Sequence, residues 1–197
     1  MKKILRIFSL TAFLFMGLGG QVVALSEREG LDIYQRGHYL EAIEYWKKAA
    51  AAGDAGSAYR LSEEFFDAKI VKRDLKTAFK YLQQAAKGND ARAITDLASF
   101  YDYGTGVTKD RKKAAQLYLR AAKMGMPAAM FNVAAMLETG EGIQMDKVEA
   151  YKYYLLSRDQ GFAPFANKAL EEMAANMTVE QIVEAEDLAD NFVPNAY

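Results

Sequence analysis

The chain has 197 residues, of which 51% are hydrophobic and 26% charged, with only three prolines and no cysteine. This composition is typical of one folded domain with a buried core, and it excludes a disordered chain and a scaffold held together by disulfides. The formal net charge of −1 at pH 7 gives no general attraction to nucleic acid.

The first 24 residues predict a cleaved export signal. Three basic residues precede an apolar run at 7–18, and small residues at 22–24 suit a signal peptidase. The run has 12 residues, whereas a helix that spans a bilayer needs roughly 20, so an uncleaved anchor is the weaker alternative. Cleavage would remove three positive charges and leave 22 Lys+Arg against 26 Asp+Glu, a net charge of −4. We therefore expect a periplasmic monomer without membrane insertion and without a nucleic-acid partner, with full secretion as the open alternative.

The remainder of the chain repeats with a period of 36 residues. Asp74, Asp110 and Asp146 lie at this interval. A period of this size is typical of proteins built from stacked supersecondary units. We expect a single domain at 25–192, divided into an N-terminal half-copy at 25–53, copies at about 54–89, 90–125 and 126–161, and a divergent copy with a cap at 162–192, followed by a tail at 193–197.

Each copy contains two apolar stripes with helical spacing. In the second copy, Ile94, Leu97 and Tyr101 belong to the first stripe, and Leu117 and Tyr118 belong to the next. Each copy is therefore predicted to be a helical hairpin. Such hairpins bury a continuous core only by stacking, so we predict an all-α solenoid.

Particular residues mark the ends of these helices. Asp110 and Asp146 are placed to cap the helices that follow them, and Gly53, Gly125 and Gly161 suit the left-handed residue that ends a helix. These positions support the division into hairpins.

The turn within each hairpin carries a Gly-x-Gly in two copies but not in the first. GTGVTKD at 104–110 resembles a phosphate loop only superficially, because no strand precedes it and the next copy has an acid in GEGIQMD. The first copy has Ala68 and Ile70 in the glycine columns, and both residues disfavour positive φ. We expect the turn at 66–71 to differ in shape, with an extended first helix as one way to achieve this.

The segment ARAITDLASFYDYGTGVTKDRKKAAQLYLRAAKMG, residues 91–125, resembles the Sel-one-like repeat (SLR) family of the tetratricopeptide superfamily. The copy at 127–161 matches the same pattern, and 38–54 resembles the second helix of a unit. The resemblance covers about 25–192 and implies a right-handed α-solenoid.

The segment at 177–192 resembles the closing helix of such chains. Thr178 and Gln181 form a capping box, Met177 and Ile182 are placed as the hydrophobic staple around it, and one face of the helix is apolar. We expect this helix to cover the last hydrophobic surface of the solenoid.

The resemblance also implies where a partner binds, because the first helix of each such unit lines the inner, concave face. Acids outnumber bases among the implied groove residues and aromatics are interspersed, which suits a basic, partly apolar protein segment. The alternative is that the acids only keep this face soluble. The implied residues are Tyr59, Glu63, Phe66, Asp67, Arg92, Thr95, Ser99, Asp102, Tyr103, Phe131, Ala135, Glu138, Asn167 and Glu171.

Residues for catalysis or cofactor binding are not evident in the sequence. His38 is the only histidine and lies between two predicted helices, where it serves as a turn residue or partial cap. Without cysteine and with one histidine, we predict no metal site, no cofactor and no nucleophilic triad.

Three functions are therefore considered. The first is a non-catalytic adaptor that docks another protein of the bacterial envelope. The second is an immunity protein that neutralises a toxic effector, a role known for some exported SLR proteins. The third is an enzyme, by analogy with cysteine-rich SLR proteins that bind β-lactams, but this chain lacks their paired cysteines.

Overall fold

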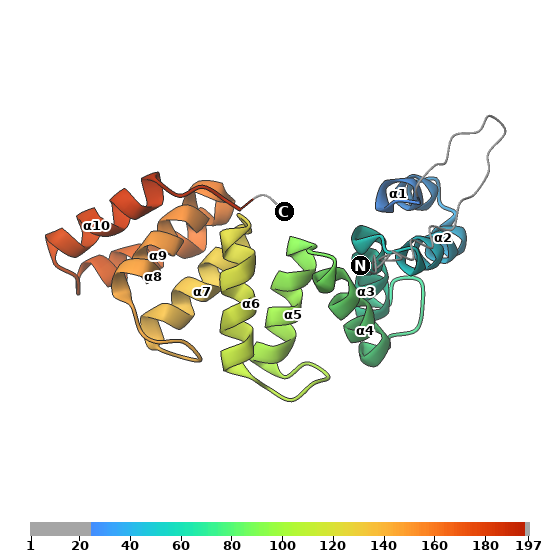
Figure 1. Cartoon of the computed structure of the whole chain (residues 1–197), viewed down its shortest axis with the longest axis horizontal. Coiled ribbons are helices and arrows are strands. Elements are labelled where there is room, and N and C mark those ends of the chain that lie inside the picture. Colours follow the sequence, from blue (N-terminus) through green and yellow to red (C-terminus); the bar gives the residue numbers. More distant parts are fainter. Residues whose placement is uncertain (1–24, 196–197) are drawn as a thin grey trace, which may run out of the picture.

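The computed structural model describes residues 25–195, which form ten α-helices and one π-helical turn arranged in an arc (Figure 1). The predicted export signal at 1–24 lies outside the described residues. The elements are α1 (Glu27–Gln35), α2 (Tyr39–Ala51), α3 (Ala55–Asp67), α4 (Leu75–Lys87), α5 (Ala91–Tyr103), α6 (Arg111–Lys123), α7 (Pro127–Thr139), α8 (Lys147–Ser157), η1 (Arg158–Phe162), α9 (Ala163–Ala174) and α10 (Val179–Asp190).

The positions of the helices confirm the 36-residue period. α3, α5 and α7 begin 36 residues apart and have 13 residues each, and α4, α6 and α8 begin at the same interval. The helices from α1 to α9 pack against their neighbours in the chain, α10 packs against α8, and one hydrophobic core runs from α2 to α10. The described part of the chain is thus an all-α solenoid of stacked hairpins. None of the helices within residues 25–195 has the length and apolar character needed to cross a bilayer.

The predicted helix ends are confirmed. The carboxylate of Asp110 accepts a hydrogen bond from the Lys113 backbone N–H at 2.9 Å, and Asp146 accepts one from Glu149 at 3.0 Å. The three predicted terminal glycines have φ of 102°, 89° and 104°, and Asn89 takes the same left-handed conformation in the remaining copy, with φ of 64°. Local sequence therefore determines where these helices begin and end.

The N-terminal segment contains two helices, α1 and α2, where we had expected a half-copy. α1 has 9 residues and lies close to α2 because Gly30 leaves room for the indole of Trp46. A Cβ atom at Gly30 would collide with the Trp46 ring. The first unit is thus a complete hairpin with a shortened first helix.

The expectation of an extended first helix before the turn at 66–71 was wrong. α3 ends at Asp67 with the same 13 residues as α5 and α7, because Ala68 adopts the left-handed conformation, with φ of 58°, that Gly104 and Gly140 adopt in the other copies. A single alanine in this region is disfavoured by roughly 1 kcal/mol, which the packing of the hairpin evidently outweighs.

Ile70 shows where the turn does differ. In the third copy, the corresponding Gly142 has φ of 77° and lies so close to the backbone of Arg111, the first residue of α6, that a Cβ atom would collide with it. Ile70 instead has negative φ and lines a shallow groove beside Tyr39, the first residue of α2. Ile70 therefore does not need the positive φ for which glycine is suited.

α10 closes the solenoid at its C-terminal end. Its main contact is with α8, and Ala185 is completely buried there, while Ile182, Ala189 and Phe192 pack partly buried against the core. The capping box predicted for Thr178 is present in both directions. The C-terminal segment then returns toward α6, where the backbone N–H of Asn195 donates to the carbonyl oxygen of Lys123 at 2.8 Å.

Candidate functional site

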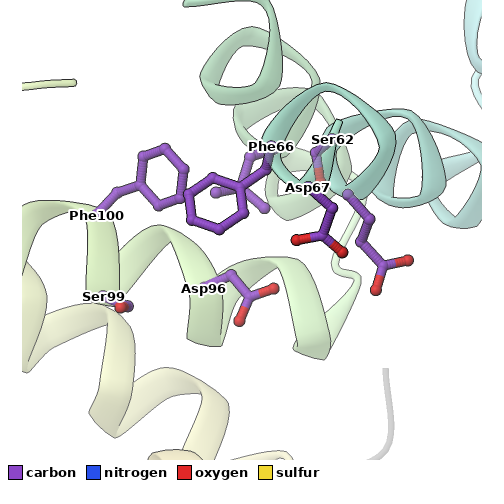
Figure 2. A pocket seen from close by; sticks show the side chains of 8 residues that line it. Ser62, Phe66, Asp67, Asp96, Ser99 and Phe100 are labelled. Carbon is purple, nitrogen blue, oxygen red and sulfur yellow. The ribbon is translucent and has the colours of Figure 1, made fainter. Parts of the chain in front are cut away.

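A pocket of about 260 Å³ lies between α3 and α5, with α4 at its floor (Figure 2). One side is apolar, because the rings of Phe66 and Phe100 lie 5.6 Å apart between centroids and Leu82 is buried beneath them. The lining residues are Ser62, Glu63, Phe66, Asp67, Leu82, Asp96, Ser99 and Phe100.

Helical spacing brings these side chains together. Glu63 and Asp67 are four residues apart on α3, and Asp96 and Phe100 are four residues apart on α5, so each pair lies on one face of its helix. The pocket therefore has carboxylates from two helices facing an aromatic wall.

The carboxylate of Asp96 is the most buried of the three and is held by one hydrogen bond, which the Tyr59 hydroxyl donates at 3.0 Å. Burial raises the pKa of Asp96, and the nearby charge of Glu63 raises it further. Burial likewise raises the pKa of the Tyr59 hydroxyl, so this group remains a donor at neutral pH. A positive charge entering the pocket would relieve this unfavourable concentration of negative charge.

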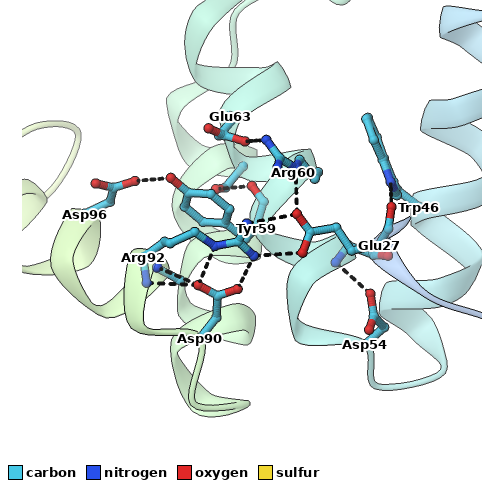
Figure 3. A network of polar contacts seen from close by, with 12 residues as sticks. Glu27, Trp46, Asp54, Tyr59, Arg60, Glu63, Asp90, Arg92 and Asp96 are labelled. Carbon is cyan, nitrogen blue, oxygen red and sulfur yellow. Dashed lines mark hydrogen bonds and ion pairs between the residues drawn. The ribbon is translucent and has the colours of Figure 1, made fainter. Parts of the chain in front are cut away.

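Glu27 of α1 holds two arginines beside the pocket (Figure 3). Its carboxylate accepts hydrogen bonds from Arg60 at 2.7 Å and from both terminal nitrogens of Arg92 at 2.9 and 2.8 Å. Arg92 also pairs with Asp90 at 2.5 Å, and its guanidinium lies over the ring of Tyr59, 4.5 Å from the centroid. Arg92 makes these ion pairs with Glu27 and Asp90, and its charge lowers the pKa of Asp96 too little to offset the effect of burial.

Three other cations lie near the pocket, and each has a partner within the chain. Arg73 lies over the ring of Phe66, with its guanidinium 5.2 Å from the centroid. Arg60 divides its guanidinium between Glu27 and Glu63, and its distance to Glu63 is 3.0 Å. Lys69 pairs with Asp67 at 2.9 Å, but both side chains are exposed. An exposed pair of this kind contributes about 0–1 kcal/mol and is readily exchanged for another partner.

Four of the residues predicted for the groove meet in this pocket: Glu63, Phe66, Asp67 and Ser99. Tyr59 and Arg92 support its margin through the contacts described above. Thr95 was predicted to face the groove but is buried, and its hydroxyl donates to the Ala91 carbonyl within α5 at 2.8 Å. The prediction for Thr95 is corrected, because its buried side chain is bonded within its own helix.

The other predicted residues lie outside the pocket. Asp102 is 3.7 Å from Arg111, and Tyr103 is 73% exposed beyond the end of the pocket. Glu138 accepts a hydrogen bond from Tyr154 at 3.0 Å. Ala135 of α7 is partly buried, and Asn167 and Glu171 are exposed on α9. These residues do not line the pocket, and the carboxylates that do line it come from α3 and α5.

Phe131 of α7 belongs to a second cluster, which is aromatic and lies toward the C-terminal end of the solenoid. Its ring centroid lies 5.3 Å from Tyr154, 6.2 Å from Phe162 and 6.3 Å from Phe165. Phe165 is 65% exposed. This cluster offers apolar contact area at a distance from the acidic pocket.

Sequence reasoning missed Asp96, Phe100 and Glu27. Asp96 lies four residues after Arg92 and three before Ser99, so helical spacing from the predicted residues could have found it. His38, which we had considered a partial cap, precedes α2 without capping it through its side chain and lies 3.4 Å from Glu41, with both side chains exposed.

Replacing Asp96 with asparagine is expected to raise the melting temperature at pH 7. Burial raises the pKa of Asp96 above its ordinary 3.8 even though the Tyr59 hydroxyl lowers it. The folded parent therefore gains stability as the pH falls through this raised pKa, whereas asparagine carries no charge at any pH. The increase in melting temperature caused by Asp96→Asn should be complete above the raised pKa of Asp96 and smaller at about pH 4. Thermal denaturation followed by circular dichroism at both pH values checks this, and an equal advantage at both would contradict it.

The chain was also compared with known protein families and with known proteins. The sequence matches the family model described as Sel1 repeat in four consecutive segments, at residues 24–54, 55–90, 91–126 and 127–162. A comparison with curated proteins gave no match.

Two solved structures are similar to this one. The Sel1 repeat protein from Oxalobacter formigenes is 31% identical, with a TM-score of 0.60, and the match covers 64% of this chain and 95% of that one. A protective antigen present in uropathogenic Escherichia coli strains, which displays an SLR fold, is 21% identical with a TM-score of 0.52. That match covers 84% of this chain but 44% of the antigen, and at this identity it shows a likeness of fold alone.

Proposed function

This chain belongs to the Sel1 repeat family, whose repeats form protein-interaction scaffolds, and on that premise we propose that it is a non-catalytic adaptor that binds a basic segment of another protein. The observation that carries the proposal is the pocket between α3 and α5, where Glu63, Asp67 and Asp96 face Phe66 and Phe100. A lysine or arginine side chain of the partner can contact both the carboxylates and the aromatic rings of this pocket.

The chemistry of the pocket matches such a side chain in two ways. The aliphatic stem can lie against Phe66 and Phe100. The charged group can then donate hydrogen bonds to the carboxylates of Asp96 and Glu63, and these charge-assisted bonds are roughly twice as strong as neutral ones. The rings supply affinity and the carboxylates supply register.

The aromatic cluster at the other end of the first helices supports a second contact. Phe165 is exposed and lies beside Phe131 and Phe162. An apolar residue of the same partner segment can pack there, which agrees with a partner that is basic and partly apolar. Large aromatic side chains of this kind often dominate the binding energy of an interface.

We place this function in the bacterial periplasm because the first 24 residues have the pattern of an export signal. Mass spectrometry of the protein recovered from cells reads its N-terminus directly. A mature chain that begins near Leu25 supports export, and recovery of intact Met1 contradicts it.

Charge reversal in the pocket tests the binding site. A variant with Glu63→Lys and Asp67→Lys is expected to capture at least about tenfold less partner from the native envelope than the parent, because the loss of one good charge contact costs 1.4 kcal/mol or more. The matched control carries Glu41→Lys and Glu44→Lys, exposed acids of α2 outside the pocket, and should capture as much as the parent. Circular dichroism verifies that both variants remain helical.

Each outcome of the capture experiment has a definite meaning. Undiminished capture by the pocket variant would overturn the assignment of the site, and equal losses in pocket variant and control would show that only net charge matters. Identification of the captured protein separates the adaptor from its alternative, because a toxic effector as the partner would instead support the immunity role.

A further inference from the structure

The outer faces of α4 and α6 form a second charged surface, which is basic where the pocket between α3 and α5 is acidic. α4 has three basic residues and no acidic one, and α6 has five basic residues and no acidic one. Lys113 is exposed but turns to Tyr101, whose hydroxyl accepts a hydrogen bond from its ammonium group. The other exposed basic residues of the two helices form the basic ridge, which consists of Lys76, Lys80, Lys87, Lys112 and Lys123.

The repeat aligns these lysines. Lys76 and Lys112 are 36 residues apart, as are Lys87 and Lys123, so each pair takes equivalent positions on consecutive second helices. The ion pairs found within residues 25–195 involve none of the five. The ridge is therefore a regular row of positive charges, of which Lys76 has the carboxylate of Asp74 nearby.

α10 presents a surface of the opposite sign. Its 12 residues include five acids and no base. The side that faces away from the buried Ala185 forms the acidic helix face, which consists of Val179, Glu180, Val183, Glu184 and Asp187. Val179 and Val183 are 72% and 56% exposed, so this face is apolar as well as acidic.

The two surfaces cannot meet within one chain. Ala185 holds α10 against α8 at the C-terminal end of the arc, whereas α4 lies toward the other end, next to α3, and α6 lies between them (Figure 1). A contact between them requires two copies.

We propose that the acidic helix face of one copy binds the basic ridge of a second copy. The four-carbon stems of Lys76, Lys80 and Lys112 can cover Val179 and Val183 while their ammonium groups reach the carboxylates of the helix face. This contact is head-to-tail, so it uses different surfaces on the two partners and leads to a ring or an open chain. It replaces the expectation of a monomer and does not depend on the pocket between α3 and α5.

Sedimentation velocity on the protein, expressed from its full sequence and purified from cells, tests the association. At about 25 mM salt the average mass should rise with protein concentration. At about 300 mM salt it should remain that of a monomer, because the Debye length falls from about 20 Å to about 6 Å and screens the exposed charges. A parent chain that stays monomeric at low salt up to the highest concentration overturns the proposal, as does association that is insensitive to salt.

A charge exchange identifies the two surfaces. The ridge variant carries Lys76→Glu, Lys80→Glu and Lys112→Glu, and the helix variant carries Glu180→Lys, Glu184→Lys and Asp187→Lys. Each alone should be monomeric at low salt, because its two surfaces then have the same sign. An equimolar mixture should associate again, and a mixture that stays monomeric would contradict the proposed pairing.

Two controls complete this experiment. The variant with Lys47→Glu and Lys48→Glu on α2 leaves both surfaces intact and should associate like the parent. Circular dichroism confirms that the reversed variants fold. Self-association of either reversed variant at the parent level overturns the assignment of that surface.

Discussion

Removal of residues 177–197, and with them α10, is expected to lower the melting temperature by roughly 10 °C or to make the protein aggregate on heating. α8 is buried along its length from Ala150 to Ser157, with α7 and α9 as neighbours and α10 against another side. Loss of α10 exposes that side and removes the burial of Ile182, Ala185 and Phe192. Partial burial of such side chains is worth about 3–5 kcal/mol in total, and a domain of this size loses about 2–4 °C per kcal/mol.

A point substitution isolates the same contact in the complete chain. Ala185→Arg places a long charged side chain at a position with no exposed surface and should reproduce most of the loss. The control replaces Val179 and Val183 with serine on the outer side of α10, where both are exposed, and should change the melting temperature by about 1 °C or less. A truncated protein as stable and soluble as the parent would show that α10 does not close the solenoid.

The elements that sequence predicted well are those that depend on local chemistry. Asp110 and Asp146 cap helices through backbone groups three residues away, and the capping box at Thr178 is equally local. The period of 36 then extends each local assignment to the next copy. Fold class and helix ends could therefore be read without knowledge of distant contacts.

The turn at Ala68 shows the limit of such local reasoning. The intrinsic preference of alanine against positive φ predicted a longer helix, but the backbone N–H of Asp74 donates to the carbonyl oxygen of Phe65 at 2.9 Å. The same closing bond occurs in the other two copies, from Asp110 to Tyr101 at 2.8 Å and from Asp146 to Leu137 at 2.9 Å. The stacked hairpin thus imposes its turn on a residue that does not favour it.

The net charge of the chain also gave an incomplete prediction of the surfaces that bind partners. The value of −4 for the chain without its first 24 residues averages over a pocket rich in carboxylates, two purely basic helices and a purely acidic α10. This separation of acidic and basic surfaces depends on which helix faces the solenoid leaves exposed. A sum over the sequence could exclude general binding of nucleic acid but could not locate the surfaces.

Glu27 was missed for a different reason. It lies 36 residues before Glu63, so the period places it in the same column of the repeat as a predicted groove residue. We had treated 25–53 as a half-copy, and the column was not extended into it. The contacts themselves, with partners 33 and 65 residues away, have no local signal.

Replacing Glu27 with glutamine is expected to lower the melting temperature by about 4–8 °C at pH 7. The side chains of Glu27, Arg60 and Arg92 are 23%, 29% and 35% exposed, so their pairing lies between an exposed pair and a buried one and is worth about 2 kcal/mol. Hydrogen bonds from Arg92 are the main cause that lowers the pKa of Glu27 below its ordinary 4.5. The stabilisation that the Glu27 carboxylate gives the folded state is therefore complete above pH 4.5 and is lost as the pH falls through the lowered pKa.

Thermal denaturation at pH 7 and at about pH 3 measures this difference. The control is Asp32→Asn, which removes the same charge from an exposed position of α1 and should have little effect. A loss for Glu27→Gln that is equally large at both pH values would show that its carboxylate charge is not the cause.

The same substitution should also weaken capture of the basic partner, because it releases Arg92 beside the pocket. Freed from Glu27, the guanidinium can turn from Asp90 toward Asp96 and neutralise the charge that the partner would otherwise meet. Addition of Arg92→Gln separates the two effects: the double variant should recover capture while remaining less stable than the parent. If capture stays weak in the double variant, Glu27 supports binding through the position of α1 and not by restraining the charge of Arg92.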